Sequence, residues 1–169
     1  MKKTLDTSSI INWRQIIIGS AVLLVGTMVY LIDRPPGHTY FVFKNAVDIS
    51  LFKNLPNLFG VIGNTLPSFV HVFAFILITA GLIFCQKRWF LIICLCWFMV
   101  DRSFELGQKF NSLASKLIPG WFAGIPFLDN TKNYFLYGTF DCFDLLAIGI
   151  GTIMAYFVLL TTRERRSER

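Results

Sequence analysis

The sequence predicts an all-α membrane protein with four transmembrane helices, and three observations predict this fold class. The 169 residues are 54% hydrophobic and 15% charged, whereas an ordinary soluble domain has about 25% charged residues. Long apolar runs alternate with short basic clusters, as expected for charges that flank membrane spans. The 18 phenylalanines exceed what one small core needs, so we expect many to face lipid. The net charge of +6 therefore indicates membrane flanks and not a nucleic-acid-binding surface.

The apolar runs and the rise of a helix predict a single transmembrane domain over residues 13–162. Twenty helical residues rise about 30 Å, which is the thickness of the hydrocarbon core. Pro35 and Pro36 end the first span, which is interpreted as an uncleaved anchor because no small-residue cleavage site follows it. Pro67 suits the first turn of the second span. The third apolar run is too short to cross unless it includes the polar stretch "DRSFELGQKF". The predicted spans are residues 13–32, 66–85, 89–110 and 139–162.

Four spans place both termini on one side of the membrane. Basic residues cluster near the N-terminus, at residues 87–88 and in the C-terminal tail, and the positive-inside rule puts these clusters in the cytoplasm. Residues 1–12 and 163–169 are therefore predicted to be cytoplasmic ends. The two outer connections, about residues 33–65 and 111–138, are long and rich in aromatic residues. We expect them to lie in the headgroup layer or to fold over the bundle.

Ionisable residues on three spans are predicted to share one depth in the membrane. Counted from the cytoplasmic end of each span, His71, Glu105 and Asp144 lie about 24–27 Å up, and Asp141 lies about one turn higher. A charge that faces lipid near mid-bilayer costs at least about 2.5–3.5 kcal/mol. We therefore expect a polar pocket that opens outward. Its predicted binding residues are His71, Asp101, Arg102, Glu105, Gln108, Asp141 and Asp144.

The spacing of these residues also predicts which helix faces they share. Asp101, Glu105 and Gln108 stand at i, i+4 and i+7 and so form one stripe. Arg102 lies at the edge of the stripe and can reach Glu105, three residues on. Asp144 is predicted to point into the bundle, because it shares a side with small residues that let another helix approach closely. Those small residues are Ala147, Gly151 and Ala155.

Purely structural roles for the same residues stay open. Intramembrane charges usually pair, so Asp101 and Arg102 are compatible with ion pairs that hold helices together. Glu105 and Gln108 are compatible with a solvated interface. His71 is compatible with a packed, hydrogen-bonded histidine. The carboxylates of the fourth span suit the N-terminus of a helix, although Asp144 lies a turn further in than a cap.

Three blocks of the sequence resemble the VanZ-like family of small bacterial membrane proteins. They are the histidine-bearing "PSFVHVFAFILITAGL", the Glu-x-x-Gln of "FELGQKF", and "GTFDCFDLLAIGIGT", and they span about residues 66–155. The sequence departs from the family at Pro67 and Ser68, where many members carry Asp-Lys, and at Ile148, where many carry Asn. The family is named for a protein linked to low-level teicoplanin resistance. The resemblance implies a multi-pass protein of the bacterial plasma (inner) membrane with an outward polar site and a cell-envelope role, and it implies no reaction.

Three functions remain open at this point. In the first, a non-catalytic binding or accessory protein holds a lipid headgroup, a lipid-linked wall precursor or a glycopeptide-type amphiphile, with Arg102 and Lys109 meeting phosphate. The second is an acid–base or metal-dependent enzyme on a lipid-linked substrate, and the lack of a recognised catalytic signature disfavours it. The third is a small ion-coupled transporter.

The same sequence features predict which cofactors and partners to expect. We assign no catalytic residue, no metal ligand and no cofactor. The expected partners are membrane lipids and a lipid-linked envelope precursor, and no nucleic acid. The sequence leaves open whether the chain forms a homo-oligomer or joins a larger membrane complex.

Overall fold

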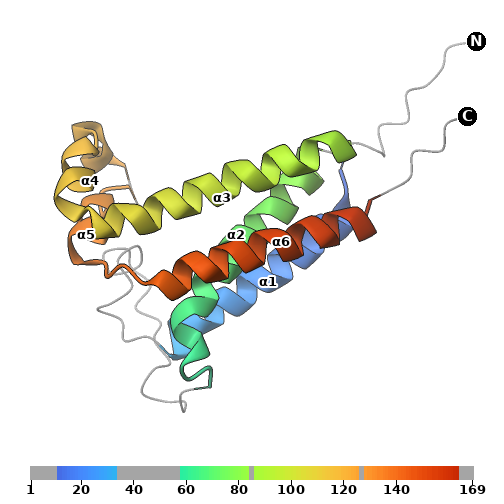
Figure 1. The fold of residues 1–169 in the computed structure, drawn as a ribbon, viewed down its shortest axis with the longest axis horizontal. Helices are drawn as coiled ribbons and strands as arrows, with labels where there is room; N and C mark the ends of the chain where they lie inside the picture. The colour runs from blue at the N-terminus through green and yellow to red at the C-terminus, as the bar shows by residue number, and fades with distance from the viewer. Residues whose placement is uncertain (1–10, 34–57, 84–85, 126–127, 164–169) are drawn as a thin grey trace, which may run out of the picture.

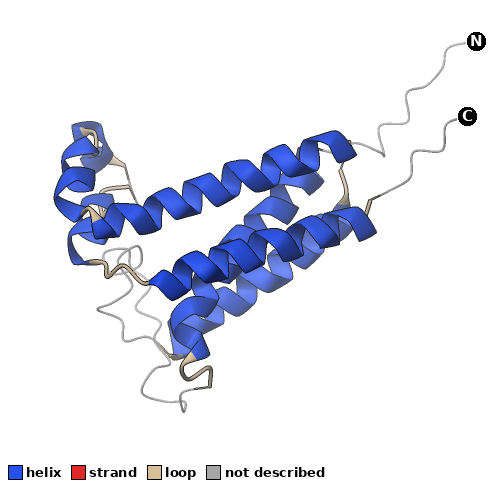
Figure 2. Cartoon of the chain, viewed as in Figure 1, coloured by secondary structure: helices blue, strands red, loops and turns tan. Residues whose placement is uncertain are grey.

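The computed structural model describes residues 11–33, 58–83, 86–125 and 128–163, and these residues form helices joined by short turns and loops (Figure 1). The four long helices are α1 (Trp13–Ile32), α2 (Ile62–Ile83), α3 (Lys87–Lys109) and α6 (Cys142–Thr161). Three short helices lie between α3 and α6, namely α4 (Asn111–Leu117), the 3-10 helix η3 (Gly120–Gly124) and α5 (Thr131–Tyr137). No strand occurs among the described residues (Figure 2).

The long helices form an antiparallel bundle whose two terminal helices meet at one end. The amide of Asn12 donates its backbone N–H to the Gly81 carbonyl at 2.9 Å, and its side chain donates to the Thr162 carbonyl at 3.0 Å. These bonds gather the start of α1, the end of α2 and the end of α6, and α3 begins close by at Lys87 (Figure 1). We call this the terminal end of the bundle; α4 and α5 lie at the opposite end, which we call the far end.

Close backbone contact between α1 and α2 depends on glycine. A Cβ atom added at Gly26 would lie 2.6 Å from Cγ1 of Val70, and one added at Gly19 would lie 2.9 Å from the Ala74 carbonyl oxygen. No side chain fits at those distances, so these positions let the two backbones approach as small residues do in membrane bundles. The contact between α1 and α2 is the most extensive helix pairing in the described part of the chain.

The apolar core lies on the other side of α2, where α3 and α6 pack against it. Gly151 of α6 is buried, and an added Cβ would lie 2.9 Å from the Phe69 carbonyl oxygen of α2. Ala155 is fully buried in the same face. The side of α6 predicted from its small residues is thus the packing side, with Ile148 buried there and Ala147 only half-buried. The buried core residues are Val72, Phe73, Ile76, Leu77, Ala80, Phe90, Cys94, Ile148, Ala155 and Leu159.

Three of the helices, α1, α2 and α6, are long and apolar enough to cross a membrane. Large apolar side chains on these helices point away from the bundle; Leu24 is 64% exposed and Phe157 is 61% exposed. Helix α3 is long enough to cross a membrane, but its charged residues make it less apolar than the other three long helices. Those residues are Lys87, Arg88, Asp101, Arg102, Glu105 and Lys109.

The observed helices differ from the predicted spans in several places. Helix α1 has the predicted bounds and ends before Asp33, which accepts hydrogen bonds from the Leu58 and Phe59 amides at 3.0 and 2.8 Å. Helix α2 begins four residues earlier than predicted, so Pro67 lies inside it and not in its first turn. The connection over 111–138 contains α4, η3 and α5. Residues 34–57 of the first connection, and the tails 1–10 and 164–169, lie outside the described residues.

Candidate functional site

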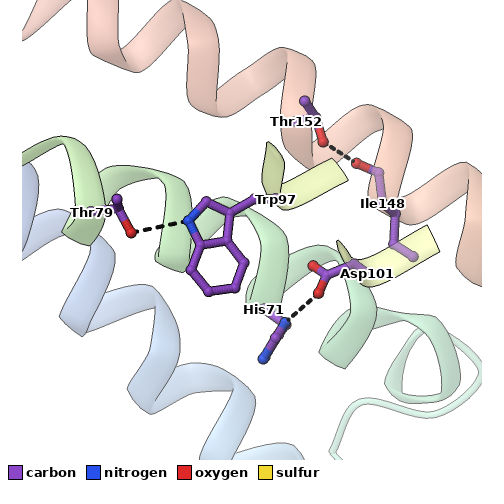
Figure 3. Close-up of polar contacts among 6 residues, drawn as sticks. All are labelled: His71, Thr79, Trp97, Asp101, Ile148 and Thr152. Atoms are coloured by element: carbon purple, nitrogen blue, oxygen red, sulfur yellow. Dashed lines mark hydrogen bonds and ion pairs between the residues drawn. The ribbon is translucent and has the colours of Figure 1, made fainter. Parts of the chain in front are cut away.

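His71 and Asp101 meet between α2 and α3. Nδ1 of His71 lies 3.0 Å from Oδ1 of Asp101 (Figure 3). The Asp101 side chain is 8% exposed, whereas that of His71 is 49% exposed. The other carboxyl oxygen of Asp101, Oδ2, is buried and has no hydrogen-bond partner among the described residues. One half of this carboxyl group is therefore paired and the other half is not.

Aromatic packing holds the His71 imidazole in place. The ring of Phe75, one turn along α2, lies 4.4 Å from the imidazole, and Phe75 stacks on Trp97 of α3 at 4.8 Å. The indole Nε1 of Trp97 donates to the Thr79 hydroxyl at 3.0 Å (Figure 3). Because the Trp97 indole is tied to α2 at one end and packed on Phe75 at its face, α2 and α3 are held at a fixed offset. That offset places His71 beside Asp101.

A second polar contact joins α2 to α6. The Ser68 hydroxyl donates to Oδ1 of Asp144 at 2.9 Å. Ser68 lies three residues before His71, toward the far end of α2. Sequence reasoning noted Ser68 only as a departure from the VanZ-like pattern and did not place it in the site. A single serine in an apolar helix has no periodic partner, so the only available signal was its closeness to the histidine.

Glu105 lies among the carboxyl groups of two helices. The residue is 7% exposed, and its Oε2 is buried without a hydrogen-bond partner among the described residues. Electrostatic repulsion acts on Glu105 from Asp144, Asp141 and Asp101, in decreasing order. The structure thus brings the third-span stripe and the start of α6 together. Glu105 stands about one helical turn further along α3 than Asp101, toward the far end.

Helix α5 covers the end of the polar stripe. Gln108 is buried, and a Cβ added at Gly138 would lie 2.8 Å from its side-chain Cδ. Phe135 packs against Gly107 and stacks on Phe104 with ring centroids 5.6 Å apart. Burial and the nearby Glu105 raise the pKa of Tyr134 well above its usual value, although a side-chain hydrogen bond with Gln108 opposes this rise. Tyr134 therefore stays a neutral phenol beside the carboxyl groups.

Two of the predicted pocket residues have other positions. Arg102 is exposed, and it forms no ion pair with Glu105. Asp141 is the N-cap of α6 and accepts a hydrogen bond from the Phe143 amide at 2.9 Å. Lys109, expected to meet phosphate, places Nζ 5.1 Å from the centre of the Phe140 ring.

The predicted depth match also needs correction. His71 and Glu105 were expected at one level, but the carboxyl that His71 contacts is Asp101. The reason is that α2 ends at Ile83, so counting from Lys87 placed His71 about one turn too far from the terminal end. The site consequently has two levels: the lower holds the His71–Asp101 contact, and the upper holds the Ser68–Asp144 contact near Glu105.

These residues form what we call the polar cluster: Ser68, His71, Asp101, Glu105, Gln108 and Asp144. Within the described ranges, no group of three or more His, Cys, Asp or Glu residues is arranged to hold a metal ion. The arrangement provides buried carboxyl groups as hydrogen-bond acceptors, together with one hydroxyl, one side-chain amide and one imidazole, and aromatic rings border it. Comparison with known proteins adds no assignment, since no family model, no curated protein and no solved structure matches this chain.

Proposed function

We propose that the chain is a VanZ-like protein of the bacterial plasma membrane that binds an amphiphilic cell-envelope molecule at the polar cluster without transforming it. The candidate ligands are a lipid headgroup, a lipid-linked wall precursor and a glycopeptide-type amphiphile. The observation that carries the proposal is the buried state of Asp101 and Glu105, each with one oxygen that lacks a donor among the described residues. Ionisable groups placed inside a membrane bundle are costly and mark functional sites.

A fourth membrane crossing by α3 supports a site that opens on the outer side. Helix α2 ends, and α6 also ends, at the terminal end of the bundle. If α2 and α6 both cross the membrane, the chain must return to the far end before α6 begins. Helix α3 makes this return, and its 23 residues rise about 34 Å, which exceeds the hydrocarbon thickness. Its charged residues are tolerable there because Asp101 and Glu105 face the bundle and not lipid.

The distribution of basic residues supports the direction of that opening. Lys87 and Arg88 lie at the terminal end, where α3 begins, and the positive-inside rule assigns such clusters to the cytoplasm. The polar cluster lies toward the far end, so it is nearer the outer surface. Helix α5 and the aromatic residues around Phe104 add apolar area beside the acceptors. This combination suits a ligand with a polar head and an acyl or prenyl chain.

The hydrogen bonds of the cluster favour binding over nucleophilic catalysis. Ser68 donates to the Asp144 carboxylate, and His71 contacts Asp101. A serine nucleophile needs its hydroxyl within hydrogen-bond reach of a general base that is itself oriented by a third group. In the described contacts the hydroxyl and the imidazole have separate partners. The same carboxyl groups suit recognition of a ligand that brings its own donors.

Co-purification tests the proposed function. Wild-type protein and Glu105→Gln would be purified in a mild detergent and compared by native mass spectrometry for bound envelope molecules. We expect an amphiphile to be retained by wild type and lost from Glu105→Gln. Arg102→Gln is the matched control, because Arg102 is the exposed neighbour on the same helix, and it should retain the ligand. Equal retention by all three proteins, or no ligand on any of them, would contradict a binding role for this cluster.

A further inference from the structure

The polar cluster is acidic, and its charge constrains the ligand. Asp101 and Glu105 are each 7% exposed and each keep an oxygen without a donor among the described residues. Two further carboxyl groups, Asp141 and Asp144, act electrostatically on Glu105. A buried carboxylate without a partner is costly, and neighbouring carboxylates increase the cost for each other. A ligand that binds here gains most if it brings positive charge and N–H donors.

The positions of the nearest basic side chains disfavour a phosphate. Arg102 is exposed and forms no ion pair with Asp101 or Glu105. Lys109 lies over the Phe140 ring, and neither cation forms an ion pair with the carboxyl groups of the stripe. A phosphate placed against Glu105 would meet like charge on every carboxyl group around it. The phosphate-binding role expected of these two residues from the sequence therefore does not fit the cluster.

The geometry favours an organic ammonium group over a metal ion. The described residues hold no group of three or more ligands spaced for a metal. An ammonium group instead presents three N–H donors that form charge-assisted hydrogen bonds with separate carboxylates. Aromatic rings border the cluster: Phe104 lies 6.0 Å from Tyr134 and 5.6 Å from Phe135, centre to centre. Such rings attract a desolvated cation through their faces.

We infer that the polar cluster recognises a protonated primary amine, which docks between Asp101 and Glu105 with its carbon chain against the aromatic residues near α5. The inference rests on the proposed binding function and names the chemistry of its ligand. The amine is carried either by a lipid headgroup or by a water-soluble molecule. Both present the same ammonium group to the same carboxyl groups, so they differ only in the chain that follows it.

Thermal unfolding of the full-length protein in neutral maltoside micelles tests the inference, with tryptophan fluorescence as the readout. The probes are dodecylamine, dodecyl phosphate and butylamine, each titrated at neutral pH. A ligand that binds the folded state raises the midpoint with its concentration. We expect dodecylamine to stabilise wild type and dodecyl phosphate to have no such effect. Stabilisation by butylamine at equal concentration identifies a soluble amine as the source, and its absence identifies an amphiphile.

Two neutral variants and one control assign the effect to the cluster. Glu105→Gln and Asp101→Asn should each weaken dodecylamine binding about 10-fold or more, as expected for losing one charge-assisted hydrogen bond. Glu105→Gln removes a buried carboxylate whose Oε2 has no donor among the described residues, so this variant should not lower the ligand-free midpoint. Arg102→Gln should bind the amine like wild type. Asp101→Asn keeps the experiment decisive if Glu105→Gln fails to fold.

Two results would overturn the inference that the ligand is an amine, and both are distinct from a failure of the proposed binding function. In the first, dodecyl phosphate stabilises wild type and Arg102→Gln abolishes this effect. The protein would then still bind a ligand, but the ligand would be an anion and not an amine. An amine effect of equal size in wild type, Glu105→Gln and Asp101→Asn, or no amine effect at all, would reject the docking position. Co-purification of an amphiphile that depends on Glu105 decides the binding function independently.

Discussion

His71 and Asp101 connect α2 to α3 through a single contact of 3.0 Å between Nδ1 and Oδ1. The two side chains have unequal surroundings, since the carboxyl is buried and the imidazole is half-exposed. The buried partner depends on the contact more than the exposed partner does, because a carboxyl group without a donor cannot turn to solvent. The pair therefore fixes the position of the acidic stripe relative to α2.

Removal of the imidazole should destabilise the protein through Asp101. We expect His71→Ala to lower the free energy of unfolding by about 1.5–3 kcal/mol, the size of a hydrogen bond to a charged group. In the Asp101→Asn background the same change should cost clearly less, because the uncompensated charge is gone. A double-mutant cycle measured by denaturant unfolding in micelles checks this coupling. Additive effects of the two changes would show that the contact has no energetic role.

Two glycines of α6 provide a matched test of the helix packing. An added Cβ at Gly151 would lie 2.7 Å from Val72 Cγ1 and 2.9 Å from the Phe69 carbonyl oxygen, whereas at Gly149 it would meet nothing within 4 Å. Gly151→Ala should therefore lower the thermal midpoint, since backbone must move. Gly149→Ala should leave the midpoint unchanged or raise it, because alanine is favoured over glycine in a helix by about 1 kcal/mol. Equal effects of the two substitutions would refute the close α2–α6 contact.

The sequence predicts the long helices well because their determinants are local. Apolar composition and length identify α1, α2 and α6, and proline after residue 34 agrees with the end of α1 at Ile32. The stripe of Asp101, Glu105 and Gln108 is buried as its spacing predicts. Each of these properties belongs to one helix and needs no knowledge of its neighbours.

Relations between helices are less accessible from the sequence. The level of His71 depends on where α2 ends, and an error of four residues placed His71 level with Glu105, whereas the structure places it beside Asp101. Whether Arg102 faces the bundle depends on which side α6 covers, and periodicity alone left it at the edge of the stripe. The short helices α4 and α5 have seven residues each, which is too few for a recognisable hydrophobic period. Their formation depends on packing against α3 and against each other.

The contact between Asn12 and Thr162 bears on the proposed fourth membrane crossing. Three crossings would put these residues on opposite sides of the membrane, whereas four crossings put them on the same side. We therefore expect single cysteines at Ser9 and Ser167, in a background that lacks the four native cysteines, to resist a membrane-impermeant maleimide in intact cells. A cysteine at Ser112, which follows α3, should react readily. Labelling of Ser167→Cys in intact cells, with Ser9→Cys protected, would mean that α3 does not cross the membrane. The starts of α2 and α6 would then lie on opposite sides, which contradicts the Ser68–Asp144 contact.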